Sequence, residues 1–169
     1  MKPKKLDWSR YQLADLLVAA VKSEIDSRDI YLRLGRKVRN AFLRERLAFL
    51  AQEEEKHRQS VEKIHHDLFP EQKLVIPVVA VVPLPEIKIS NEEVPLSEVL
   101  QAAMNAEEIA YHFYRQLALR FDRDDEKKRL LLYFAAMEMG HYRLLEVEQQ
   151  NAERFEEYGQ EQEMIHLGP

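Results

Sequence analysis

The motif Glu-x-x-His occurs twice in this chain of 169 residues, as Glu54 with His57 and as Glu138 with His141. In an α-helix, residues three positions apart project about 60° from each other and lie about 4.5 Å apart along the axis. A carboxylate and an imidazole at this spacing can therefore bind one metal ion from adjacent turns. Such ligands suit iron or manganese and disfavour the soft copper(I) ion.

The first motif interrupts an apolar stripe that has the spacing of a helix facing a core. The stripe runs in steps of three and four, and continuing it through the gap leads to Glu54 and His57; its apolar members are Leu43, Leu47, Leu50, Val61, Ile64 and Leu68. The second motif lies on a similar stripe. Two further glutamates, Glu24 and Glu107, occupy corresponding places on two others. Four carboxylates and two imidazoles are thus expected in one core.

Buried glutamates need compensating positive charge. An ionised carboxylate isolated in a core is costly enough to become protonated or to require a partner, and no lysine or arginine lies on these stripes near the glutamates. Two divalent ions would neutralise four carboxylates with both histidines neutral. The predicted metal ligands are Glu24, Glu54, His57, Glu107, Glu138 and His141. The spacing leaves open whether Glu24 and Glu107 bridge the two ions or bind one each. A single motif would more often be a solvated helix face, but two at equivalent places favour a metal site.

Prolines divide the helical parts of the chain. Five of the seven prolines lie between Pro70 and Pro95, and proline breaks helix interiors. The pattern predicts a single domain over residues 1–169, with helices at about 10–37, 40–67, 95–121 and 124–157 and a connector over 68–95. Asn40 and Asp124 are expected N-caps, and Pro95 is expected in the first turn of the third helix. The last helix is expected to stop near Gly159.

The two halves of the chain repeat each other. A shift of 83 residues (107 − 24) places Glu24 on Glu107 and Tyr31 on Tyr114, and a shift of 84 (138 − 54) superimposes the two Glu-x-x-His motifs. Short links make the helices of each half antiparallel. A helix as long as the second one measures about 40 Å, and an extended connector covers that distance with fewer than half of its residues. The expected fold is all-α: a four-helix bundle with one long crossover between the second and third helices.

The sequence resembles the rubrerythrin family of the ferritin-like superfamily. The residues that carry the resemblance follow in one order over nearly the whole chain: Glu24 with Tyr31, Glu54 with His57, Glu107 with Tyr114, and Glu138 with His141. The resemblance implies a ferritin-like bundle whose two iron ions reduce hydrogen peroxide or oxidise ferrous iron with oxygen; manganese or zinc can replace the iron. It also implies that Tyr31 and Tyr114 assist catalysis by hydrogen bonds to the ligand carboxylates, with plain core tyrosines as the alternative.

Three features depart from this family. Typical rubrerythrins carry a C-terminal rubredoxin module with four cysteines, whereas these 169 residues contain none. The expected electron source is therefore an external donor such as a rubredoxin-like protein. The family also has a further glutamate three residues after the ligand on the third helix, where this chain has Ala110, which weakens the expectation of a peroxidase. The connector is unusually rich in valine and proline. A non-catalytic bundle that binds, stores or senses iron needs the same ligands and remains the alternative.

Composition bears on the location and the partners. The net charge of −5 argues against an extended nucleic-acid surface. No apolar run reaches the roughly 18 residues of a membrane span, and no signal peptide is visible. We expect a cytoplasmic protein that binds neither nucleic acid nor membranes. The apolar part of the connector, residues 74–87, is expected to pair with its counterpart in a second subunit and form a homodimer or higher homo-oligomer. The alternative is that it lies along its own bundle.

Other polar residues near the motifs are not expected to be ligands. Asp26 and Asp29 could orient a ligand histidine, with a surface role as the alternative. Gly140, inside the second motif, is expected to mark close helix packing or room beside the metals. The residues expected at the solvated surface are Glu53, Glu55, Glu108, His65, His66, His112 and His166.

Overall fold

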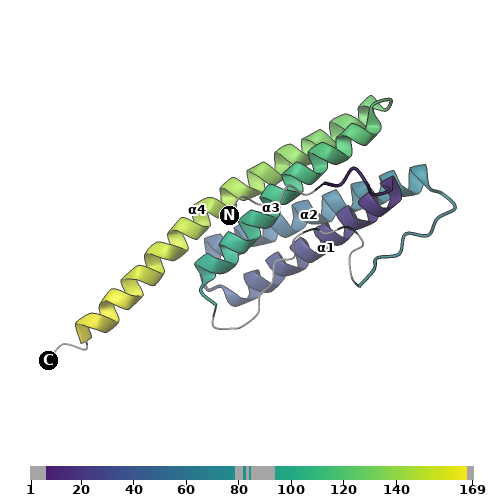
Figure 1. Cartoon of the computed structure of the whole chain (residues 1–169). Helices are drawn as coiled ribbons and strands as arrows, with labels where there is room; N and C mark the ends of the chain where they lie inside the picture. The colour runs from purple at the N-terminus through teal and green to yellow at the C-terminus, as the bar shows by residue number, and fades with distance from the viewer. Residues whose placement is uncertain (1–6, 79–81, 83, 85–93, 167–169) are drawn as a thin grey trace.

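A computed structural model describes residues 7–78, 82, 84 and 94–166, with only the backbone for 159–166. Within these residues the chain forms four α-helices and one short 3-10 helix and contains no strand. The helices are α1 (Leu13–Lys37), α2 (Ala41–Leu68), α3 (Leu96–Ala118) and α4 (Asp125–His166), with η1 (Leu119–Phe121) between the last two. The all-α four-helix bundle expected from the sequence is confirmed (Figure 1).

The predicted N-caps satisfy backbone donors at the starts of two helices. The Asn40 side chain accepts a hydrogen bond from Leu43 N at 3.2 Å, and the Asp124 carboxylate accepts one from Lys127 N at 3.0 Å. Such caps stabilise the start of a helix. Pro95 immediately precedes α3 instead of lying in its first turn, which places its fixed φ at the helix boundary.

Helix α4 is longer than the sequence pattern indicated. The prediction that it stops near Gly159 is wrong, because the helix continues to His166. One interior glycine costs only about 1 kcal/mol relative to alanine, and the glutamates and glutamines on either side of Gly159 are good helix formers. As a result, α4 projects well beyond the ends of the other three helices, as its yellow part shows (Figure 1).

The helices pack as two antiparallel hairpins, α1 with α2 and α3 with α4. Helices α2 and α3 run in the same direction, so the end of α2 and the start of α3 lie at opposite ends of the bundle, as the predicted crossover requires (Figure 1). Val82 of this connector is 0 % exposed and packs into the core, and Leu74, Ile76 and Leu84 pack against the same cluster. These residues lie along their own bundle. Much of the segment expected to pair between subunits falls outside the described residues, and that pairing stays a prediction.

The apolar core consists of two clusters separated along the bundle. One contains Leu17, Val61 and Leu131, and the other contains Leu50 and Leu145. On α4, Glu138 and His141 are buried between Phe134 of the first cluster and Leu145 of the second. A polar layer is therefore enclosed by apolar side chains on both sides, which excludes water and lowers the local dielectric constant.

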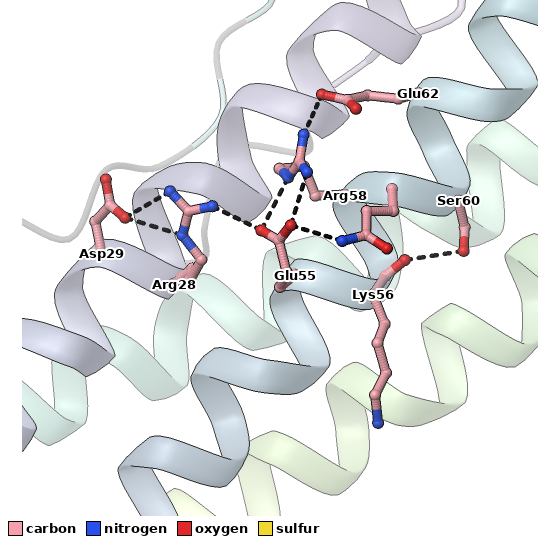
Figure 2. Close-up of polar contacts among 8 residues, drawn as sticks. Arg28, Asp29, Glu55, Lys56, Arg58, Ser60 and Glu62 are labelled. Atoms are coloured by element: carbon pink, nitrogen blue, oxygen red, sulfur yellow. Dashed lines mark hydrogen bonds and ion pairs between the residues drawn. The ribbon is translucent and has the colours of Figure 1, made fainter.

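A charged network ties α1 to α2 outside this layer (Figure 2). The Arg28 guanidinium donates to Glu55 at 2.6 Å, and Arg58 donates to the same carboxylate at 2.7 Å and 2.9 Å. Hydrogen bonds from Arg58 are the main reason that the pKa of Glu55 falls to about 2. Because the network is partly exposed, its contribution to stability is modest. Glu55 thus belongs to the surface between the hairpin helices, as expected, and not to the buried layer.

Candidate metal centre

All six predicted ligands meet in the buried polar layer. Helix α1 contributes Glu24, α2 contributes Glu54 and His57, α3 contributes Glu107, and α4 contributes Glu138 and His141. Each of these residues is between 1 and 4 % exposed. Every helix thus supplies a glutamate at the same level of the bundle, because each glutamate interrupts an apolar stripe at the same point of the repeat. Their role as metal ligands stays a prediction.

The cluster divides into two overlapping groups. Glu24, Glu54, His57 and Glu138 form one group, and Glu54, Glu107, Glu138 and His141 form the other. In each group, one nitrogen or oxygen atom from each residue lies within 4.8 Å of the others. Glu54 and Glu138 belong to both groups, whereas Glu24 and Glu107 belong to one each. Glu54 and Glu138 could therefore serve two metal positions, whereas Glu24 and Glu107 could serve one each.

Each histidine lies nearest to the glutamate of the opposite motif. His57 Nδ1 lies 3.0 Å from Glu138 Oε1, and His141 Nδ1 lies 3.1 Å from Glu54 Oε1. Within the motifs, the corresponding separations are longer, 3.6 Å from His57 Nδ1 to Glu54 Oε2 and 3.3 Å from His141 Nδ1 to Glu138 Oε2. The two motifs therefore interlock across α2 and α4.

The donor atoms of this cluster fit a pair of metal ions. Glu54 Oε1, His57 Nδ1, Glu138 Oε1 and His141 Nδ1 are all buried, and none has the geometry of a hydrogen bond. Buried polar atoms normally have hydrogen-bond partners, and these four instead face one another at 3.0 and 3.1 Å without that geometry, an arrangement that bound cations would satisfy. Imidazole nitrogens and carboxylate oxygens are the usual ligands of divalent iron, manganese and zinc.

The two tyrosines cross between the hairpins. Tyr31 of α1 donates a hydrogen bond from its hydroxyl to Glu107 of α3, and Tyr114 of α3 donates one to Glu24 of α1. This confirms that the phenols contact the predicted ligand carboxylates. Burial, and then the charge of the bonded glutamate, raises the pKa of each phenol well above its usual value. The tyrosines therefore remain protonated at neutral pH and fix the orientation of Glu24 and Glu107; a part in catalysis stays a prediction.

The four glutamates differ in their affinity for protons. Burial, followed by the charges of Glu54 and Glu138, raises the pKa of Glu24 and of Glu107 well above the usual value. Burial also opposes the ionisation of Glu54 and Glu138, but the neighbouring histidines outweigh it and lower the pKa of both carboxylates. Without metal, Glu24 and Glu107 therefore hold their protons to higher pH than an ordinary glutamate, whereas Glu54 and Glu138 lose theirs at lower pH.

The histidines complete the charge balance. Burial alone would lower the pKa of His57, but Glu138, Glu24 and Glu54 outweigh it and raise this pKa to about 12. The pKa of His141 is raised for the same reason by Glu107, Glu138 and Glu54, against the effect of burial. Two imidazolium ions then balance two carboxylates. Two divalent ions would instead balance four carboxylates, with both histidines neutral.

The rings around the cluster form part of its apolar wall. The Phe134 ring lies 4.5 Å from the His57 ring, and the His57 and His141 rings are stacked at 5.7 Å. Phe134 lies four residues before Glu138 on the core-facing stripe of the same helix. Its ring restricts the rotation of the His57 imidazole and helps to keep water out.

The surrounding polar residues lie outside the cluster, with one unexpected placement. Asp26 pairs with Lys22 at 2.6 Å and Asp29 with Arg28 at 2.8 Å, which supports their surface role. The expectation that His65 is exposed is wrong: it is 3 % exposed and lies 5.4 Å, between ring centroids, from Phe69. The chain leaves the helix at Phe69, so this side chain packs on a face of α2 that the apolar pattern did not mark as buried.

Gly140 lies on the outer face of α4, away from its neighbours. A Cβ atom added to it would meet no atom within 4 Å, so the expectation of close helix packing is wrong there. We expect Gly140→Ala to raise the free energy of unfolding by about 0.5–1 kcal/mol, because alanine loses less backbone entropy in a helix. Urea denaturation of the metal-free protein measures this change. A loss of stability, or a changed metal content, would contradict an open position on the outer face.

None of the described helices has the combination of length and apolarity that a membrane crossing requires.

The family model described as Rubrerythrin matches residues 15–149. A solved structure of a hypothetical protein from Pyrococcus furiosus is similar over 88 % of this chain and 95 % of its own, with 33 % sequence identity and a TM-score of 0.80. No curated protein sequence matches this chain.

Proposed function

This chain belongs to the rubrerythrin family, and from that premise we propose that its buried cluster binds two iron ions and reduces hydrogen peroxide or oxygen. The observation that carries the proposal is that two four-residue groups share Glu54 and Glu138. Carboxylates common to both groups would hold two ions in one site, which two-metal chemistry requires. Manganese or zinc would fit the same donor atoms, so iron is part of the proposal.

Two ferrous ions would supply one electron each, which with two protons converts one hydrogen peroxide molecule into two water molecules. The apolar clusters on both sides of the polar layer would limit the access of bulk water to this step. It must also hold each carboxylate in place, which Tyr31 does for Glu107 and Tyr114 for Glu24. Both phenols retain a proton at neutral pH beside the cluster, and we propose that they position protons for the reduced oxygen atoms.

Repeated turnover would require electrons from outside the metal pair. The 169 residues contain no cysteine to hold a one-electron iron centre of the rubredoxin type. We therefore propose an external donor, such as a rubredoxin-like protein, that reduces the metal pair after each reaction.

A non-catalytic role in iron storage or sensing is the second candidate. The observation that favours it is the near-complete burial of all six residues, each at most 4 % exposed. A closed site retains metal well but admits an oxidant slowly.

One experiment separates these functions. Protein loaded anaerobically with ferrous iron is mixed with hydrogen peroxide, or with oxygen, in a stopped-flow spectrometer while the optical spectrum is recorded, and reduction is then repeated with a chemical donor. We expect two irons per chain, oxidation in one fast phase, and repeated cycles. Tight binding of two irons without reaction with either oxidant would leave the storage or sensing function. Failure to bind two ions would contradict both candidates.

Ala110 provides a test of oxidant preference. It lies half-buried on α3, three residues after Glu107, where the family resemblance places a further glutamate. We expect wild-type protein to react with peroxide and oxygen at more similar rates than Ala110→Glu, in which the ratio of peroxide to oxygen rate should rise by about tenfold, or about 1.4 kcal/mol of barrier. Stopped-flow rates of the diferrous proteins measure the ratio. An unchanged ratio would show that this position does not set the preference.

A further inference from the structure

The only tryptophan of the chain, Trp8, begins a series of aromatic rings that ends at the buried cluster. The Trp8 ring lies 5.3 Å from the Phe113 ring, and the Phe113 ring lies 5.8 Å from the Tyr114 ring, both in edge-to-face contact. The Tyr114 ring in turn lies 6.4 Å from the His57 ring, and its hydroxyl donates a hydrogen bond to Glu24. Trp8, Phe113 and Tyr114 are named the aromatic path below.

The outer end of the aromatic path lies just below the surface. Trp8 is 4 % exposed, whereas Asp7 and Ser9 on either side of it are exposed. The guanidinium of Arg120 holds this turn in place by donating hydrogen bonds to the backbone oxygens of Ser9 and Tyr11. A molecule in solution therefore approaches the indole closely without entering the bundle.

The aromatic path exists on one side of the internal repeat only. The shift of 83 residues that places Tyr114 on Tyr31 places Phe113 on Ile30 (113 − 83). Both Phe113 and Ile30 are buried. Within the described part of the chain, Tyr31 contacts no other aromatic ring, whereas Tyr114 contacts three. The repeat thus keeps both tyrosines but surrounds only Tyr114 with rings, which points to a role on this side alone.

Packing alone does not account for an indole at Trp8. Its Nε1 atom is buried and has no hydrogen-bond partner among the described residues. A buried donor without a partner destabilises a fold, and a phenylalanine or leucine would fill the same apolar surroundings without this cost. An indole differs from these side chains in that it readily loses one electron.

We propose that the aromatic path carries an electron from Trp8 to the buried cluster when the cluster holds a single ferrous ion and meets hydrogen peroxide. This inference rests on the proposed binding of iron and reduction of peroxide. Conversion of one peroxide molecule and two protons into two water molecules takes two electrons, and one ferrous ion supplies only one. Without a second electron, cleavage of the O–O bond releases a hydroxyl radical inside the protein. Trp8 supplies that electron and becomes an indole radical cation.

The three rings divide the transfer into two steps. Tyr114 gives up an electron while its hydroxyl proton moves along the hydrogen bond to Glu24. Trp8 then returns an electron to Tyr114 through the Phe113 ring that lies between them, and the proton returns to the phenol oxygen. The net change is one electron lost by Trp8. A one-electron reductant in solution replaces it at the exposed turn.

Flash photolysis of the metal-free protein tests the path without the metal. Light that indole absorbs and phenol does not will ionise Trp8, the only tryptophan. Tyr114 should then reduce the indole radical, which uses the same path in the reverse direction, so the absorption of a phenoxyl radical should appear as that of the indole radical decays.

Three variants identify the rings involved in this transfer. Tyr114→Phe should lose the phenoxyl signal. Phe113→Leu should slow the transfer by about tenfold, equivalent to about 1.4 kcal/mol of barrier. Phe121→Leu is the matched control and should keep the wild-type rate, because Phe121 belongs to the same core cluster but, among the described residues, makes no ring contact with the path.

Peroxide tests the role of the path in the loaded protein. Protein that contains one ferrous ion per chain is mixed with hydrogen peroxide, frozen and examined by electron paramagnetic resonance, and oxygen addition to Trp8 is measured by mass spectrometry. Wild-type protein and Phe121→Leu should show an indole radical and oxidised Trp8. Phe113→Leu should show several-fold less of both, and Trp8→Phe should show no indole radical.

Two results would overturn the inference. The first is a photolysis rate in Phe113→Leu equal to that of the wild type, or a phenoxyl signal that persists in Tyr114→Phe. The second is a loaded protein that consumes peroxide while Trp8 stays unoxidised. A loaded protein that does not consume peroxide would overturn the proposed function and with it the role of the path, whereas photolysis would still decide whether the path conducts.

Discussion

Replacing Glu54 with glutamine is expected to reduce the metal content from two divalent ions per chain to less than one. Glu54 belongs to both four-residue groups, so the substitution removes one charged ligand from each ion. It also leaves His141 without its nearest carboxylate, which lies 3.1 Å away. Glutamine preserves the shape but is a poor ligand for a divalent ion, and removing a shared carboxylate weakens both positions together.

The matching change at Glu24 should have a smaller effect. Glu24 belongs to one group only, so Glu24→Gln should leave one ion per chain. Equilibrium dialysis against ferrous iron or cobalt(II), followed by metal analysis, measures both values. Glu55→Gln is the control, because Glu55 is adjacent in sequence to Glu54 but lies in the surface network with Arg28 and Arg58, and it should retain two ions. Equal losses in Glu54→Gln and Glu24→Gln would contradict the distinction between shared and single ligands.

The location of this cluster could be predicted because helix periodicity is a local property. Glu54 and His57 interrupt an apolar stripe, and a stripe shows which side chains a helix buries before any partner helix is known. The internal repeat then placed Glu24 and Glu107 at corresponding levels. Burial of all of these residues follows from the spacing alone, and the structure agrees.

The roles within the cluster depend on distances between helices, which periodicity does not contain. The spacing suggested that each histidine acts with the glutamate of its own motif, whereas His57 Nδ1 lies closer to Glu138 than to Glu54. The hydrogen bond from Tyr31 of α1 to Glu107 of α3 likewise depends on how the helices pack, which periodicity does not show. The burial of His65 was not predicted for a related reason. Phe69, whose ring lies against His65, comes just after the end of α2 and is not part of its apolar stripe.

Protonation of the cluster determines how the stability of the metal-free protein should vary with pH. The pKa of His57 is raised to about 12 in the folded protein, against about 6.5 when unfolded. A raised pKa stabilises the fold below the unfolded value, and this stabilisation is lost as the pH rises toward the folded value. His141, Glu24 and Glu107 are shifted in the same direction. Glu54 and Glu138 have lowered pKa values, so their contribution is lost only in acid.

The metal-free protein should therefore melt at progressively lower temperature between pH 7 and pH 9, while the metal-loaded protein should change little. Each extra proton held by the folded state costs about 1.4 kcal/mol of stability per pH unit in this range. Bound metal removes the effect, because its ligands are already deprotonated and binding releases their protons.

The proton count provides a direct measurement of the same coupling. Titration of the metal-free protein with zinc or ferrous iron in weak buffer near pH 7 should release at least the two histidine protons per two ions, and up to four when Glu24 and Glu107 also ionise. In Glu24→Gln with Glu107→Gln, those two sources are absent, and the melting temperature of the metal-free variant should vary less with pH. A melting temperature independent of pH, together with release of less than one proton per pair of ions, would show that the histidines are neutral before metal binds. The charge balance described for this cluster would then be wrong.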